Sequence, residues 1–306
     1  MAMVCDRSPV PQARPQDTGG FILVAVLWIL GGLATLAAIY AVYVVNAATG
    51  MTVDEDRLQV EASMSGALEL TAYYLNAVEP AARPGNGAFN FQLGGKRVAV
   101  SFVSEAAKID LNAASKAVLA GLFKVLGAQP EAADEFADRI IGWRSPSERE
   151  IESFDKEITA YRTAGLGYDP RQAPFASVQE LWLVLGLPPD LVERAMPFLT
   201  VFSGVSGVDV MDAAPEIVAA LPGMTPVRLD NVLNLRTVRP VDAAAMLSAL
   251  GPAQTGAAVQ ASAAIRVRIA VELPRGHRAN GEAVILLLGD APDPYRVLYW
   301  SDGFDG

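Results

Sequence analysis

Apolar residues are concentrated in one uninterrupted run near the N-terminus, at residues 21–45, which read FILVAVLWILGGLATLAAIYAVYVV. No charged residue occurs between Asp17 and Asp54. At about 1.5 Å rise per residue, a helix of this length extends roughly 37 Å, which is enough to cross a hydrocarbon core of about 30 Å. The pattern therefore predicts a single membrane-spanning helix.

The helical periodicity continues beyond the apolar run. Apolar or small residues recur every three or four positions, at Leu58, Ala62, Ser65, Leu68, Ala72 and Leu75. We expect one helix from Phe21 to about Val78, ended by the prolines and glycines that begin at Pro80. The amphipathic second half of this helix is expected to pack on a sheet.

Alternating apolar and polar residues predict strands in two separate parts of the chain. A β-hairpin is expected around the turn Gly94-Gly95, with strands at residues 89–93 and 98–102. The alternation resumes near the C-terminus, at residues 265–273, 284–288 and 295–300. The simplest arrangement is one β-domain that is interrupted by a helical insertion.

The intervening residues 108–255 carry helix-start signals at Asn112, Pro130 and Ser177. A polar piece between Ser145 and Pro174 is expected to be a loop. A weak internal repeat is also present, because Leu111-Asn112-Ala113-Ala114 recurs one hundred residues later as Met211-Asp212-Ala213-Ala214. The repeat predicts two similar small helical units, with a chance match in an Ala-rich sequence as the alternative.

The predicted fold class is α+β: a long N-terminal spine helix packs on an antiparallel β-sheet, and a large all-α domain is inserted into that sheet. The expected divisions are a leader at residues 1–20, the transmembrane half of the spine at 21–45, the rest of the spine and the first hairpin at 46–107, the inserted α-domain at 108–255, and the closing strands at 256–306.

Charge and cysteine content limit the partners and the compartment. The net charge is −10, with 24 Lys and Arg against 34 Asp and Glu, whereas a protein that binds nucleic acid through phosphates normally carries a basic face. No nucleic-acid partner is therefore expected. Cys5 is the only cysteine, so no disulfide is expected once the leader is removed.

Residues suited to catalysis or to transition-metal binding are scarce. His277 is the only histidine and lies in a polar turn, and Ser206 lacks the following glycine of a nucleophile elbow because position 208 is valine. An enzyme and a resident cofactor are therefore not expected. Calcium needs only oxygen ligands, and four aspartates flank the last strands, although a solvated acidic loop is the favoured interpretation. They are Asp290, Asp293, Asp302 and Asp305.

The residues before the apolar run are typical of a processed leader. They are short and Pro-rich, and they end in Gly19-Gly20 directly before Phe21. This arrangement resembles the type IV prepilin leader, in which a prepilin peptidase cuts between Gly20 and Phe21 and the new N-terminus at Phe21 is methylated. The arginines before the span and the acidic residues after it place the N-terminus in the cytoplasm and the bulk of the chain in the periplasm. An ordinary single-pass anchor is the alternative.

Parts of the helical region look like the helix-hairpin-helix module of DNA-uptake receptors. The similar stretches are 109–115, 140–144, 174–181 and 197–201. That module holds a phosphate on the backbone N–H groups of a Gly-x-Gly turn at a helix start. The matching turns here are Gly127-Ala128-Gln129, Gly186-Leu187-Pro188 and Gly223-Met224-Thr225, and each lacks the second glycine. We expect the shape of the module without its phosphate-binding chemistry.

Together, the leader, the Asp-Leu-Asn-Ala-Ala-Ser start at Asp110 and the closing strand Tyr-Arg-Val-Leu-Tyr-Trp at 295–300 resemble general secretion pathway protein K. This family is the large minor pseudopilin of type II secretion systems. Ordinary pilins carry a glutamate at the fifth position after the cut, where this chain has Ala25. The resemblance implies a non-enzymatic subunit in the bacterial inner membrane, at the tip of the pseudopilus, where it helps to start assembly.

The resemblance also implies partners: the I- and J-type minor pseudopilins, contacted through the long helix and the β-domain, and the prepilin peptidase. Members of the family can bind calcium, but no ligand set can be matched residue by residue. Two alternatives stay open. One is a membrane-anchored helix-hairpin-helix DNA-binding or uptake protein, and the other is a minor pilin of a true type IV pilus.

Overall fold

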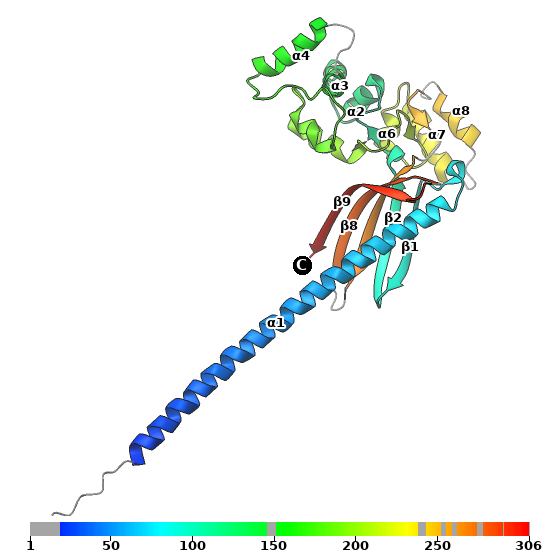
Figure 1. Ribbon diagram of the computed structural model, residues 1–306. Helices are drawn as coiled ribbons and strands as arrows, with labels where there is room; N and C mark the ends of the chain where they lie inside the picture. The colour runs from blue at the N-terminus through cyan, green and yellow to red at the C-terminus, as the bar shows by residue number, and fades with distance from the viewer. Residues whose placement is uncertain are drawn as a thin grey trace, which may run out of the picture. The chain divides into compact units, whose positions relative to one another are not determined.

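The computed structural model describes residues 19–145, 151–237, 243–251, 255–258, 262–273, 278–289 and 291–305 (Figure 1). The chain divides into two units, Met1–Gln59 and Val60–Gly306. Helix α1 (Gly19–Asn76) begins in the first unit and ends in the second. The expected helix from Phe21 to about Val78 is thus confirmed to within two residues at each end.

The second unit contains a five-stranded antiparallel sheet in the order β1-β2-β7-β8-β9. After α1, a short 3₁₀ turn η1 (Pro80–Ala82) leads into the sheet. The strands are β1 (Asn86–Leu93), β2 (Lys96–Ser104), β7 (Ala264–Glu272), β8 (Arg278–Leu287) and β9 (Tyr295–Asp305). Because β2 and β7 are hydrogen-bonded neighbours, everything between them in sequence is an insertion into one sheet.

The end of α1 is held on this sheet by a continuous apolar layer. Alternate residues of β2 and β7 are buried, as the sequence alternation predicts, and they meet Met64, Leu68 and Leu75 of α1. Fully burying one such side chain contributes roughly 1.5–3 kcal/mol relative to leaving it exposed. The amphipathic half of α1 therefore packs on the sheet as expected.

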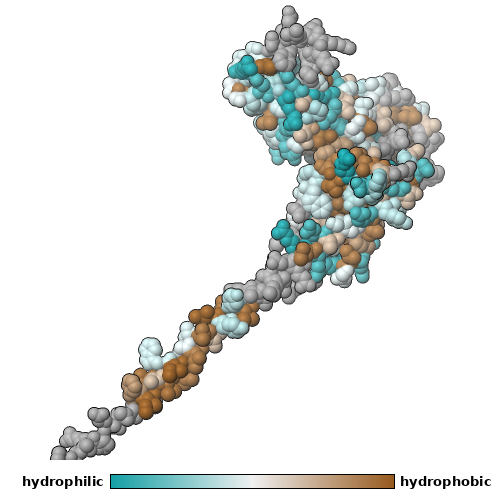
Figure 2. Space-filling view, viewed as in Figure 1, coloured by the Kyte–Doolittle hydropathy of each residue, from teal (hydrophilic) through white to brown (hydrophobic). Residues whose placement is uncertain are grey.

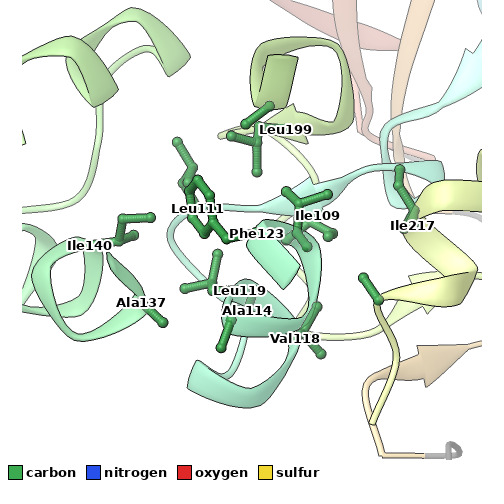
Figure 3. Packing of buried hydrophobic residues seen from close by; sticks show 14 of the residues in the cluster. Ile109, Leu111, Ala114, Val118, Leu119, Phe123, Ala137, Ile140, Leu199 and Ile217 are labelled. Carbon is green, nitrogen blue, oxygen red and sulfur yellow. The ribbon is translucent and has the colours of Figure 1, made fainter. Parts of the chain in front are cut away.

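The insertion contains helices and short strands around a core of its own (Figure 3). In chain order the elements are η2 (Glu105–Ala107), β3 (Ile109–Asp110), α2 (Lys116–Val125), α3 (Pro130–Arg144), α4 (Ile151–Thr163), η3 (Val178–Leu183), α5 (Pro189–Ala195), η4 (Met196–Phe198), β4 (Leu199–Thr200), β5 (Val208–Asp209), α6 (Pro215–Ala219), α7 (Pro226–Thr237), α8 (Ala243–Leu250) and β6 (Ala257–Ala258). Leu111, Leu119 and Phe123 are fully buried within this core.

Two features of the insertion differ from the sequence prediction. The region is not purely helical, because β3 pairs with β4 and β5 with β6 as parallel two-residue ladders, which are too short to show a period in sequence. The polar piece expected to be a loop contains α4. Its apolar residues Ile151, Phe154, Ile158 and Tyr161 have helical spacing, and Tyr161 is fully buried.

The last strands are longer than predicted. Strand β8 begins at Arg278 rather than at residue 284, and β9 ends at Asp305 rather than at residue 300. The early residues of β8 that face α1 are small, namely Ala279, Gly281 and Ala283. Met64 fills the space above Gly281, so the strand is buried without the large alternating side chains that reveal a strand in sequence.

Close packing between α2 and α6 gives a test of the inserted core. A Cβ added at Gly121 would collide with the backbone carbonyl of Ala220. We expect Gly121→Ala to lower the free energy of unfolding by about 1–3 kcal/mol, because overpacking outweighs the gain of about 1 kcal/mol in helix propensity. Denaturant unfolding of the full chain in detergent measures this.

The matched control is Gly167→Ala, because a Cβ at Gly167 meets no atom within 4 Å. We expect that variant to lie within about 0.5 kcal/mol of the parent chain. Equal stability of the two variants would show that α2 and α6 are not in contact as described.

Candidate functional site

The N-terminal unit presents a hydrophobic helical surface. Residues Phe21–Val44 form a candidate membrane span with a mean hydropathy of 2.5, and the space-filling view shows hydrophobic side chains along it (Figure 2). The Thr35 hydroxyl donates to the carbonyl oxygen of Gly31 at 2.8 Å. A hydroxyl in lipid can be satisfied in this way by a carbonyl of its own helix. The unit fits a single-pass membrane anchor.

The predicted processing residues all lie at the start of α1. Gly20 and Phe21 are in its first turn and Ala25 is in the next. The Phe21 side chain is largely exposed, and Ala25 leaves this part of the span without a carboxylate. Cleavage between Gly20 and Phe21, methylation of Phe21 and the tip role of Ala25 stay predictions.

The three turns that resemble helix-hairpin-helix modules have the expected backbone but not the phosphate-binding donors. Gly127, Gly186 and Gly223 adopt φ of 94°, 82° and 75°, the left-handed region that favours glycine. The helices that follow them each begin with a proline, which has no N–H to offer an anion. These prolines are Pro130, Pro189 and Pro226.

Basic side chains beside two of these turns are already engaged. Lys124 lies 2.8 Å from Asp134, and this hydrogen bond lowers the pKa of the Asp134 carboxyl. Arg228 donates to the carbonyl oxygen of Gly223 at 2.7 Å. In a chain with a net charge of −10, these two cations are thus already bound to protein oxygens.

The internal repeat is present in three dimensions, but its register is one position away from the one predicted. Asp110 matches Asp209 rather than Val210, because each aspartate ends a two-residue parallel strand. Each also accepts a hydrogen bond on Oδ1 from the N–H two residues further on, Asn112 at 2.7 Å and Met211 at 3.0 Å. The predicted register had aligned Ala113-Ala114 with Ala213-Ala214, which is one position away from the structural match.

In each copy of the repeat, an arginine at the end of the second helix binds the turn that precedes the first helix. Arg144 of α3 and Arg236 of α7 each donate to two backbone carbonyls of the turn that follows the short strand. Burial lowers the pKa of both guanidinium groups. The acceptors are Leu111 and Ala114 in the first copy, and Val210 and Ala213 in the second.

The two equivalent aspartates have different surroundings. Asp110 Oδ2 accepts from the hydroxyl of Ser203 at 2.9 Å and from the N–H of Gly204 at 2.8 Å. Asp209 is only 2% exposed, and burial raises its pKa to about 6, with the nearby charge of Asp212 adding to the effect. The second copy therefore holds a carboxylate whose desolvation is only partly compensated.

A buried polar cluster joins the insertion to the sheet. Glu105 of η2 is buried and accepts from Arg266 of β7, with Nε–Oε1 at 2.6 Å, and from the Thr200 hydroxyl of β4. Arg266 also contacts Glu282 of β8, whose other oxygen lies 2.8 Å from Arg268. Sequence reasoning missed this cluster, because Arg266 stands at an outward position of an alternating strand and its partners are far away in the chain.

The predicted catalytic and metal candidates are not brought together. Ser206 is exposed in the loop between β4 and β5, not at a strand-to-helix turn. His277 lies outside the described residues, and among the four aspartates considered for calcium only Asp293 has a described side chain, which is exposed. No group of three His, Cys, Asp or Glu that could hold a metal occurs among the described residues.

A shallow hollow of about 580 Å³ lies on the sheet. Its lining includes small residues such as Ala99 and Ala270, together with the Arg268–Glu282 ion pair. Ala99 and Ala270 alternate with the residues that face α1, so they lie on the opposite face of the sheet. The groups that line the hollow do not form a nucleophile-and-base pair of the kind that covalent catalysis uses.

Comparison with known proteins identifies the central part of the chain. Residues 98–204 match the family model described as type II secretion system (T2SS), protein K. A chain in the crystal structure of the GspK-GspI-GspJ complex from the enterotoxigenic Escherichia coli type 2 secretion system is similar in fold, with a TM-score of 0.55 and 15% identity over 84% of this chain and 99% of that chain. No curated protein matches the sequence. The family resemblance and the α+β fold class expected from the sequence are confirmed.

The environment of Asp209 gives a pH-dependent prediction. Its pKa is raised in the folded chain, so the folded state binds more protons than the unfolded state between about pH 4 and pH 6. We expect the free energy of unfolding to fall by up to roughly 2–3 kcal/mol as pH rises through this window. Asp209→Asn keeps the acceptor for Met211 and removes the charge, so it should flatten this dependence and stabilise the chain at pH 8.

Denaturant unfolding at several pH values measures this effect, with Asp110→Asn as the matched control. That variant should destabilise the chain, because an amide in place of Oδ2 cannot accept from both Ser203 and Gly204. An Asp209→Asn chain that keeps the full pH dependence of the parent would contradict the assignment.

Proposed function

We propose a role for this chain that starts from its family: it belongs to the type II secretion system protein K family, and we infer that it acts as a minor pseudopilin at the tip of the pseudopilus. The observation that carries the proposal is helix α1, apolar over Phe21–Val44 and packed by its last turns on an antiparallel sheet. The family match at residues 98–204 covers most of β2 and the first part of the large insertion between β2 and β7.

The membrane arrangement follows from the N-terminal sequence. In the proposed topology, the N-terminus is cytoplasmic, the single span crosses the inner membrane, and the sheet and insertion lie in the periplasm. Arg7 and Arg14 before the span, against Asp54 and Glu55 after it, support this orientation. The prepilin peptidase would cut between Gly20 and Phe21, and Phe21 would be methylated.

The tip position rests on the chemistry of position 25. In pilins the glutamate at this position pairs with the N-terminal amine of a neighbouring subunit inside the membrane, where an unpaired charge is costly. A subunit with Ala25 cannot make that pair, so nothing draws it beneath an earlier subunit. The bulk of the insertion also supports a subunit on which no other stacks.

The proposed partners are the other minor pseudopilins, with which this subunit would start pseudopilus assembly for export across the outer membrane. The chain of similar fold belongs to the GspK-GspI-GspJ complex, which supports partners of the I and J type. The role is structural rather than enzymatic, and it requires no cofactor. A calcium ion near the last strands stays an untested proposal.

Processing by a prepilin peptidase tests the proposal directly. We expect co-expression of the full chain with the peptidase to give a product that begins at Phe21, because cleavage removes the twenty leader residues. Gly20→Val should stay uncut, since a branched side chain replaces the glycine at the cleaved bond, whereas Gly19→Ala should be cut. Intact-mass spectrometry distinguishes these products.

A control prepilin processed in the same cells shows that the peptidase is active. If the control is cut and this chain is not, the span is an ordinary anchor and the pseudopilin role is wrong.

The tip assignment makes a separate prediction about Ala25. Ala25→Glu places a carboxylate in the membrane with no amine above it, which is unfavourable by several kcal/mol. We expect this variant to lower secretion several-fold in a strain that lacks the parent chain, while Ala25→Leu secretes normally. Secretion is measured as the exported fraction of a known substrate, and full activity of Ala25→Glu would contradict the tip position.

A further inference from the structure

Strand β9 forms one edge of the five-stranded sheet, and its outer side is not paired with any other strand that the structure describes. It is the longest strand, Tyr295–Asp305. Such an edge presents a row of backbone N–H and C=O groups that another strand can pair with, and proteins normally protect it with lysines, prolines or short length.

The middle of this edge is apolar and exposed. Four consecutive large residues, Val297, Leu298, Tyr299 and Trp300, have between 37% and 45% of their surface accessible. Figure 2 shows hydrophobic side chains gathered where β9 passes below the helices of the insertion. The opposite edge strand β1 exposes small or polar residues such as Ala88 and Asn90 along its length, with Leu93 at its end as its exposed large apolar residue.

The rest of the unit covers this apolar run only in part. The ring of Phe202, from the insertion, lies 6.3 Å from the ring of Tyr299. The register shift between β8 and β9 leaves Leu298 as an extra residue between Val297 and Tyr299, and such a bulge limits which strands can pair here. Large apolar side chains at an unpaired edge still need a covering strand of compatible pattern.

We propose that this edge docks on the same edge of a second copy of the chain, as an antiparallel β9–β9 pair centred on Tyr299. An interface of this kind is self-complementary, because each residue of one copy meets its counterpart in reverse order. The pair places Leu298 opposite the partner copy's Trp300, and Tyr299 opposite itself. Directly opposed apolar residues of this size favour strand pairing.

The pairing of opposite charges favours the register centred on Tyr299. Three antiparallel registers pair at least three of the four apolar residues with one another: one centred on Tyr299, one between Leu298 and Tyr299, and one centred on Leu298, which puts Arg296 opposite Trp300. Only the first places Arg296 opposite Asp302 of the other copy; the second places it opposite Ser301. Opposite charges across a strand pair are favourable and set the register. The inference goes beyond the proposed function, because it concerns two copies of this chain.

Cysteine cross-linking of the full chain in detergent tests the register, in a Cys5→Ser background. At the centre of an antiparallel pair the two Cα atoms are about 4.5–5.5 Å apart, within disulfide range. We expect Tyr299→Cys to form a disulfide-linked dimer at least tenfold faster than Asn90→Cys on the opposite edge. The parent chain should have twice the monomer mass by light scattering.

Lysine substitutions separate docking from folding. Trp300→Lys and Leu298→Lys should each shift the chain to monomer while the far-UV circular dichroism spectrum stays that of the folded chain, whereas Asn90→Lys should leave the dimer intact. Monomeric parent chain at tens of micromolar, or equal cross-linking of Tyr299→Cys and Asn90→Cys, would overturn the proposal. Cleavage at Gly20 is scored on the same samples, so a failure of this inference is distinguishable from a failure of the pseudopilin role.

Discussion

The buried ion pair between Glu105 and Arg266 is the interaction on which the arrangement of the Val60–Gly306 unit depends. The hydrophobic cores of the insertion and of the sheet share no residue, and this pair, with the Thr200 hydroxyl, lies between them. A buried pair contributes little net stability, but removing one partner destabilises a protein by about 3–5 kcal/mol. Its directional bonds therefore tie the insertion to the sheet between the two separate apolar cores.

The parts of the fold that the sequence predicted are those with long, regular patterns. The α1 helix, the hairpin β1–β2 and the alternation of β7 follow from periodicity over many residues, and the structure has all three. The pattern failed where burial uses small residues or short elements. Ala279 and Gly281 let β8 approach α1 without large side chains, and the two-residue ladders β3–β4 and β5–β6 depend on partners distant in sequence.

The features of the candidate site likewise fall into those that local sequence predicts and those that depend on contacts between distant segments. Features carried by local sequence were available at once: the charge-free span, the Gly20-Phe21 junction, and the prolines that remove donors from the hairpins. Features that depend on contacts between distant segments could not be predicted from the sequence. The bonds that Arg144 and Arg236 donate to backbone carbonyls join a helix end to the turn after a short strand, many residues earlier in the chain. These bonds define the correct register of the repeat, and the local sequence does not predict them.

The duplicated units combine left-handed glycine turns with helix starts that have a proline in place of an N–H donor. The turns at Gly127 and Gly223 still need left-handed backbone to reverse the chain, so the glycine stays for a steric reason. The prolines that follow preorganise the next helix start while removing an N–H. Each unit directs polar groups inward, because its aspartate accepts from a backbone N–H and its arginine donates to two backbone carbonyls, and these bonds hold the strand, the turn and the two helices together.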